Sequence, residues 1–173
     1  MRDFNIPVKA FRFISMFALL LSTANLLIAQ TESEKPSIPI YTFDEFNHYL
    51  SKDDGKIYII NFWATWCAPC VAELPYFERI GQEYKDKNVH VVLVSLDFPR
   101  QYETRLIPFV EERQLKSEVL MLNDPDANAW IPKVSNRWSG AIPATLFYNS
   151  ALREFHEKQF NYEELVEIVS KFL

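Results

Sequence analysis

The chain contains only two cysteines, Cys67 and Cys70, and they lie in the run Trp66-Cys67-Ala68-Pro69-Cys70. A C-x-x-C pair that follows a strand and opens a helix is typical of a thiol–disulfide redox centre. In such a centre one thiolate is the nucleophile, and a second thiol resolves the mixed disulfide. Because Cys67 lies where the helix should start, free backbone N–H groups and the helix dipole favour its anion. We therefore assign the attack on the substrate to Cys67 and its resolution to Cys70.

A carboxylate and three histidines are the other side chains that bear on this chemistry. Glu73 follows Cys70 by three residues, which places both on one face of a helix. Its carboxylate is a candidate acceptor for the Cys70 proton, and the alternative is an ordinary solvated helix carboxylate. Structural zinc would compete for the cysteines, but zinc normally takes four ligands. His48, His90 and His156 do not pair at ligand spacing, so no metal site is predicted. A structural disulfide around so short a loop would constrain the chain little.

The elements on either side of the motif follow from apolar patterns. Residues 57–62 form an apolar run with β-branched side chains, which predicts a buried central strand. A helix is expected to continue from Cys70 to about residue 85, and Pro69 suits its first turn, where the missing N–H is not needed. Apolar periodicity and capping residues predict the other elements: a helix started by Thr42, strand 89–96, helix 103–115, strand 119–122, helix 127–134, strand 144–148, return strand 152–157 and a last helix started by Asn161. This order predicts an α/β domain with a central mixed β-sheet flanked by helices.

Composition and charge narrow the class of protein. Of the 173 residues 49% are hydrophobic, which is enough for a packed core. The net charge is −5 without a basic run, which argues against nucleic-acid binding. An apolar stretch near the start follows three basic residues, as in a secretory signal. We predict a signal peptide over residues 1–29, with an uncleaved anchor as the alternative, then a linker over 30–37 and one domain over 38–173.

Residues 61–70, Asn-Phe-Trp-Ala-Thr-Trp-Cys-Ala-Pro-Cys, strongly resemble the active-site segment of the thioredoxin superfamily. Glu73 and Pro75 stand three and five residues after the second cysteine. This spacing resembles the TlpA/ResA branch of exported, thioredoxin-like disulfide reductases. The resemblance covers residues 38–173. It implies a thioredoxin-like fold with a family-type helix–strand insert after the central strand, which residues 103–122 fit.

The same resemblance implies roles for single residues. Pro143 matches a cis proline that faces the cysteines, and the backbone of Ile142 would then hold a substrate strand beside Cys67. Asn61 stands where cytosolic thioredoxins have a buried aspartate, and it cannot take a proton. Glu73 therefore becomes the expected proton acceptor. The expected substrate-contacting residues are Trp66, Ala68, Pro69, Ile142 and Pro143.

The leading functional hypothesis is an exported reductase of protein disulfides, such as the one in the haem-binding motif of an apocytochrome c. It would work in the periplasm or on the outer face of the cytoplasmic membrane. We expect a monomer with no cofactor besides the redox-active Cys67–Cys70 disulfide, no nucleic acid and no metal. Because dithiols tend to be oxidised outside the cytosol, it would need a membrane-linked electron donor. The alternatives are an oxidase of the same fold and a binding module with idle cysteines.

Trp138 is expected to line the partner groove or to pack in the core. Gln159 and Phe160, where thioredoxins often have glycine, are expected to reshape the substrate rim.

Overall fold

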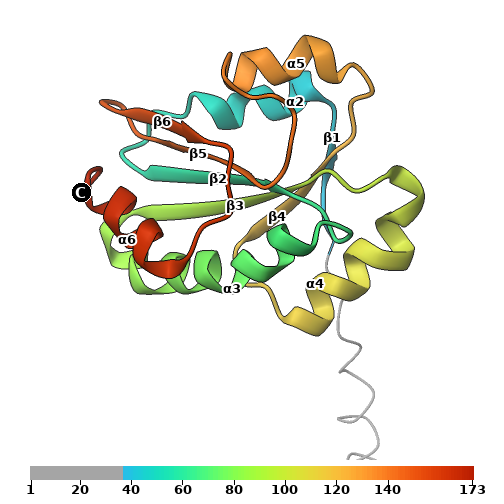
Figure 1. Ribbon diagram of the computed structural model, residues 1–173, viewed down its shortest axis with the longest axis horizontal. Coiled ribbons are helices and arrows are strands. Elements are labelled where there is room, and N and C mark those ends of the chain that lie inside the picture. Colours follow the sequence, from blue (N-terminus) through green and yellow to red (C-terminus); the bar gives the residue numbers. More distant parts are fainter. Residues whose placement is uncertain (1–36) are drawn as a thin grey trace, which may run out of the picture. The chain divides into compact units, whose positions relative to one another are not determined.

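The structure is a computed structural model that describes residues 37–173 and consists of one sheet between two layers of helices (Figure 1). The strands are β1 (Ile40–Tyr41), β2 (Ile57–Trp63), β3 (Val89–Ser95), β4 (Glu118–Leu122), β5 (Ala144–Tyr148) and β6 (Arg153–His156). The helices are α2 (Phe43–Phe46), α3 (Ala68–Glu83), α4 (Ile107–Arg113), α5 (Ala127–Val134) and α6 (Tyr162–Ser170). Short 3₁₀ segments occupy Asn47–Leu50, Lys85–Lys87 and Pro99–Gln101.

The sheet is mixed and has the strand order β1-β4-β3-β2-β5-β6. The pairs β1/β4, β4/β3 and β3/β2 are parallel, whereas β2/β5 and β5/β6 are antiparallel. This confirms the α/β sheet with flanking helices, and α4 and β4 supply the helix and strand expected after the central strand. The predicted signal peptide over residues 1–29, and the predicted linker as far as residue 36, lie outside the described residues. From residue 37 onward, no helix combines the length and the apolar character that crossing a membrane requires.

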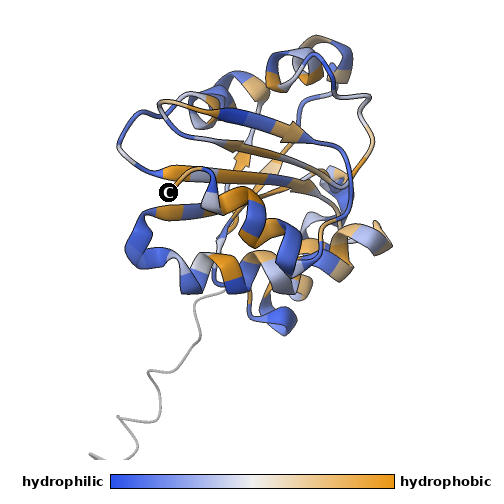
Figure 2. Ribbon diagram, turned by 60° about the vertical axis from the view of Figure 1, so that its left-hand side comes forward, coloured by the Kyte–Doolittle hydropathy of each residue, from blue (hydrophilic) through white to orange (hydrophobic). Residues whose placement is uncertain are grey.

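The alternation of side chains along β2 determines which of them face helix α3. All seven residues of β2 are buried, because helices cover both faces of the sheet: α3, α4 and α6 on one side, α2 and α5 on the other (Figure 1). Successive side chains of a strand point to opposite faces. Ile59 and Trp63 pack in the core on the α3 side, and Asn61 between them points to the same side. The helices carry hydrophobic residues beside hydrophilic ones, as Figure 2 shows, which suits elements with one face on the sheet.

The single helix predicted over residues 103–115 is wrong in its first half. The chain forms a π-helical segment, Tyr102–Leu106, and only then continues as α4. Pro108 explains the difference, because it has no N–H to donate to Thr104 and its ring would clash with that carbonyl in a regular helix. The wider turn is closed instead by a hydrogen bond from the Ile107 N–H to the Tyr102 carbonyl.

Trp138 belongs to the core. Its ring lies 4.6 Å from the ring of Phe62 and 5.6 Å from the ring of Trp130, measured between centroids. Its indole N–H donates to the carbonyl of Ala141 at 2.8 Å. The core expectation for Trp138 is therefore confirmed, and the partner-groove expectation is wrong.

Candidate active site

Cys67 and Cys70 are joined by a disulfide between the end of β2 and the first turn of α3. Cys67 is the N-cap residue, and its sulfur accepts a hydrogen bond of 3.4 Å from the Cys70 N–H. That N–H would otherwise lack a partner, and it favours negative charge on the Cys67 sulfur. Cys67 is 6% exposed and Cys70 is fully buried. Of the two cysteines, the one assigned to attack is thus the one with some exposed surface.

The Ile142–Pro143 peptide bond is cis, as the resemblance implied. The carbonyl oxygen of Ile142 lies 3.7 Å from the sulfur of Cys67. β5, which begins directly after Pro143, pairs with β2 next to the cysteines and so brings this segment to the disulfide. Ile142 is partly exposed, and its carbonyl and the Cys67 sulfur are neighbours.

Glu73 is fully buried within α3, and each of its carboxylate oxygens has a hydrogen-bond donor. Oε1 accepts from the Asn61 side-chain amide at 2.8 Å, and Oε2 accepts from the backbone N–H of Phe160 at 2.7 Å. Asn61 reaches Glu73 because it shares the α3 side of β2 with Ile59. These contacts exclude the solvated-carboxylate interpretation of Glu73.

Burial raises the pKa of Glu73 from its ordinary value of 4.5 to about 7, although the hydrogen bonds from Phe160 and Asn61 favour the anion and partly offset the rise. A carboxyl group with a pKa near 7 exchanges its proton readily at neutral pH. Glu73 is one helical turn from Cys70. The arrangement therefore puts a titratable buried carboxyl on the same face of α3 as Cys70.

The remaining predicted contact residues surround the disulfide. Ala68 and Pro69 form the exposed start of α3, and Trp66 is 47% exposed directly before Cys67. Ala68 and Pro69 lie between the two cysteines, and Trp66 and the Ile142–Pro143 bond lie beside Cys67. The structure thus brings all the residues predicted for the site to one place, between the end of β2 and the start of β5.

Sequence reasoning missed two contributors near the site and the role of a third. Phe160 was expected only at the substrate rim, but it is buried and donates its backbone N–H to Glu73, a role of which its side chain carries no signal. Asp97 is a buried carboxylate that binds the loop before Cys67: it accepts from the N–H and the hydroxyl of Thr65. Its position directly after β3 was the available signal. Phe98, next to it, lies with its ring almost parallel to that of Trp66.

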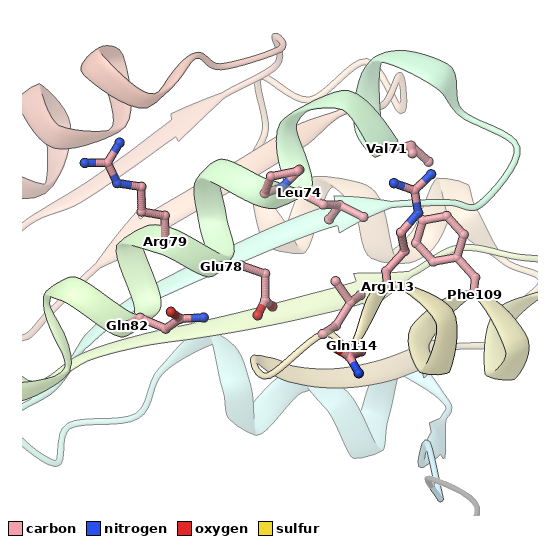
Figure 3. A pocket seen from close by; sticks show the side chains of 10 residues that line it. Val71, Leu74, Glu78, Arg79, Gln82, Phe109, Arg113 and Gln114 are labelled. Atoms are coloured by element: carbon pink, nitrogen blue, oxygen red, sulfur yellow. The ribbon is translucent and has the colours of Figure 1, made fainter.

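A groove of about 360 Å³ runs between α3 and the end of α4 (Figure 3). Val71, Leu74 and Glu78 line it from α3, and Phe109 and Arg113 line it from α4. Neither cysteine lines this groove, although Val71, which directly follows Cys70, does. In the part of the chain that the structure describes, no three His, Cys, Asp or Glu side chains form a group that could hold a metal ion.

The chain is similar to several known proteins. A model of the family described as AhpC/TSA matches residues 40–151. The thiol-disulfide oxidoreductase ResA of Oceanobacillus iheyensis is 52% identical over 54 residues, which are 31% of this chain and 28% of that protein. The thioredoxin-like protein YneN of Bacillus subtilis is 32% identical over 92 residues, 53% of this chain and 54% of that protein. The chain therefore spans about half, or less, of the length of these relatives.

Solved structures of low sequence identity share the fold. StoA from Bacillus subtilis superposes with a TM-score of 0.52 at 22% identity, over 68% of this chain and 84% of that one. A thioredoxin-type protein from Neisseria meningitidis, described as putative in its structure report, superposes with a TM-score of 0.53 at 21% identity, over 72% and 77%. The thioredoxin-like fold predicted from the sequence is confirmed.

Proposed function

The chain belongs to the AhpC/TSA family, and from this premise we propose that it is a thiol–disulfide oxidoreductase that works through Cys67 and Cys70. One arrangement carries the proposal: the disulfide at the start of α3, with a buried carboxyl of pKa about 7 one helical turn behind it. A binding module would have no need for a titratable group in that place. The similarity to proteins named ResA points to the same chemistry.

The proposed direction is reduction of a protein disulfide by the dithiol form. The Cys67 thiolate attacks one substrate sulfur, the substrate disulfide breaks, and its leaving thiolate takes a proton. Cys70 then gives its proton to Glu73 and attacks the Cys67 sulfur. This step forms the Cys67–Cys70 disulfide and releases the second substrate sulfur as a thiolate, which is protonated in turn. Two electrons pass from the protein to the substrate. Of the two protons that the substrate takes up, one comes from Cys70 by way of Glu73, and the other comes from solvent because Cys67 reacts as the thiolate.

The proposal also covers the cellular location of the protein, its electron donor and its substrates. We place the protein outside the cytoplasm, in the periplasm or on the outer face of the cytoplasmic membrane, because residues 1–29 have the pattern of an export signal. In that oxidising setting the dithiol is restored by a membrane-linked dithiol donor through a second exchange. The proposed substrates are protein disulfides, including that of an apocytochrome c, so that the domain supports cytochrome c maturation. It acts as a monomer, and the two cysteines serve as the redox group without a metal or another cofactor.

A trapping experiment tests the activity and identifies the partners. In Cys70→Ser the resolving thiol is absent, so mixed disulfides on Cys67 should persist and can be identified by mass spectrometry after expression in the host. The matched control is Cys67→Ser, which keeps Cys70 but has no attacking thiol and should trap nothing. Equal trapping by both variants would contradict the assigned roles. Turnover of a protein disulfide that is unchanged in Cys67→Ser would make the cysteines idle.

A measured reduction potential decides the direction. A reductase should have a potential near the reducing end of the thioredoxin-like range, roughly −270 mV or below, whereas a strong oxidase lies near roughly −120 mV. The potential follows from equilibration of the Cys67–Cys70 pair with glutathione or dithiothreitol buffers, read by alkylation and mass. A value near the oxidising end would assign the domain to disulfide formation instead.

A further inference from the structure

Two aromatic rings lie in solvent beside the reacting disulfide. Trp66 is 47% exposed and Phe98 is 51% exposed. Their ring centroids are 6.2 Å apart and their planes differ by 19°, which is a stacked arrangement. Trp66 directly precedes Cys67, whereas Phe98 comes from the loop after β3. Large apolar side chains left in solvent next to a reactive group indicate a contact surface, because water contact with them is unfavourable.

A buried carboxylate, Asp97, fixes this pair of rings. Its oxygens accept from the Thr65 N–H at 3.1 Å, from the Thr65 hydroxyl at 2.6 Å and from the Ser95 hydroxyl at 2.8 Å. These bonds tie the loop after β3 to the loop before Cys67. The residue after Thr65 is Trp66, and the residue after Asp97 is Phe98, so the same bonds hold both rings in register. Asp97 has no part in the proton and electron transfers described above.

We propose that Phe98 contacts the substrate, that Asp97 positions it, and that the Trp66–Phe98 pair selects disulfides whose attacked cysteine has a large apolar side chain next to it. This inference rests on the proposed function. A side chain adjacent to a cysteine bonded to Cys67 would reach the rings, because Trp66 is itself adjacent to Cys67. An apolar or aromatic side chain placed there removes ring surface from water and stacks, whereas a small polar one gains neither.

Paired peptide substrates test the preference. Two disulfide-linked peptides of equal length and charge are used, one with tryptophan and one with serine beside the cysteine. Equal charge matters because the Arg100 guanidinium lies 5.3 Å from the Phe98 ring centroid. The wild-type protein should have the higher kcat/KM for the tryptophan peptide. Since an aromatic contact changes a rate constant by about threefold to tenfold, Phe98→Ala should lower this selectivity ratio by that factor.

Leu152→Ala is the matched control. Leu152 is also an exposed large apolar residue, but it lies in the β5–β6 turn, at the opposite end of β5 from Pro143. It should leave the selectivity ratio unchanged. A ratio in Phe98→Ala equal to that of the wild type, or a wild-type ratio of one, would overturn the inference.

Asp97→Asn tests the positioning role separately. It should lower the selectivity ratio as Phe98→Ala does, and the double variant should show no further loss, because both changes remove the same stack. Independent losses that multiply would overturn the role of Asp97. If Asp97→Asn does not fold, Thr65→Val, which removes the hydroxyl that donates to Asp97 at 2.6 Å, takes its place in the same comparison. A wild-type protein that reduces neither peptide, although dithiothreitol reduces its own disulfide, would instead refute the proposed function.

Discussion

Replacing Glu73 with glutamine should remove a pH-dependent part of the folding free energy. Glu73 is fully buried, and burial raises its pKa to about 7 in the folded protein, against 4.5 for the exposed group. Glutamine has nearly the same shape but does not titrate. In the oxidised protein both cysteines are in the disulfide, so no thiol titration is superimposed on the signal from Glu73.

The sign and size of this pH-dependent change in the free energy of unfolding follow from proton linkage. Below pH 4.5 Glu73 is protonated in both states, and its contribution to stability is complete. Between pH 4.5 and about 7 the unfolded chain releases this proton while the folded protein keeps it, so the free energy of unfolding falls as pH rises. Above about pH 7 the loss is complete. At about 1.4 kcal/mol for each pKa unit, the total loss is about 3 kcal/mol.

Urea unfolding of the oxidised wild type and of Glu73→Gln, at pH values from 4 to 9, measures this difference. The wild type should lose about 3 kcal/mol relative to the variant across the range, because titrations common to both proteins cancel. Glu83→Gln, on the same helix, is the control. Hydrogen bonds from Tyr162 and Arg79 lower the pKa of Glu83 below its ordinary value of 4.5, so Glu83 is ionised in both states at neutral pH, and the curves of this variant and the wild type should run parallel from about pH 6 upward. Parallel curves for the wild type and Glu73→Gln would refute the reasoning.

Three further substitutions test the surroundings of Glu73. Asn61→Asp puts a second carboxyl where the amide now lies 2.8 Å from Glu73. Because two neighbouring carboxyl groups resist ionising together, the pKa of Glu73 should rise. The loss of stability should therefore move above pH 7 in the same urea titration. Phe160→Ala removes a buried ring and should cost roughly 3–5 kcal/mol in urea unfolding, and a loss below 1 kcal/mol would contradict its place in the core. Asn161→Ala removes the N-cap of α6, including its hydrogen bond to the Glu164 N–H; a loss of about 1 kcal/mol is expected from thermal unfolding, and no loss would mean that water caps the helix equally well.

The arrangement of the candidate site could be predicted from the sequence because it depends on side chains close together in the chain. Cys67, Cys70 and Glu73 lie within two helical turns, so helical geometry alone relates them. Pro143 is remote, and only the resemblance to a family connected it to the cysteines. The role of Phe160 could not be predicted because its contribution is a backbone N–H, which every residue except proline has.

Two local features of the fold also could not be predicted from sequence patterns. Apolar periodicity predicted a helix over 103–115, but Pro108 prevents a regular helical hydrogen bond in that stretch and a π-helical turn forms. Trp138 was equally suited to a groove or to a core, because an aromatic side chain serves in both. Only the position of Phe62 and Trp130 beside it decided between them.

The pairing of β1 with β4 affects whether copies of the protein can associate through the edges of their sheets. β4 ends in apolar residues, Leu120, Met121 and Leu122, and an unpaired strand of this kind is a template for another chain. β1 covers it with two residues only, and the Pro39 and Tyr41 carbonyls accept hydrogen bonds from the N–H groups of Met121 and Asn123. At the other margin, β6 is four residues long and includes charged side chains. Both edges of the sheet are therefore formed by short strands, which disfavours edge-to-edge pairing between copies of the protein.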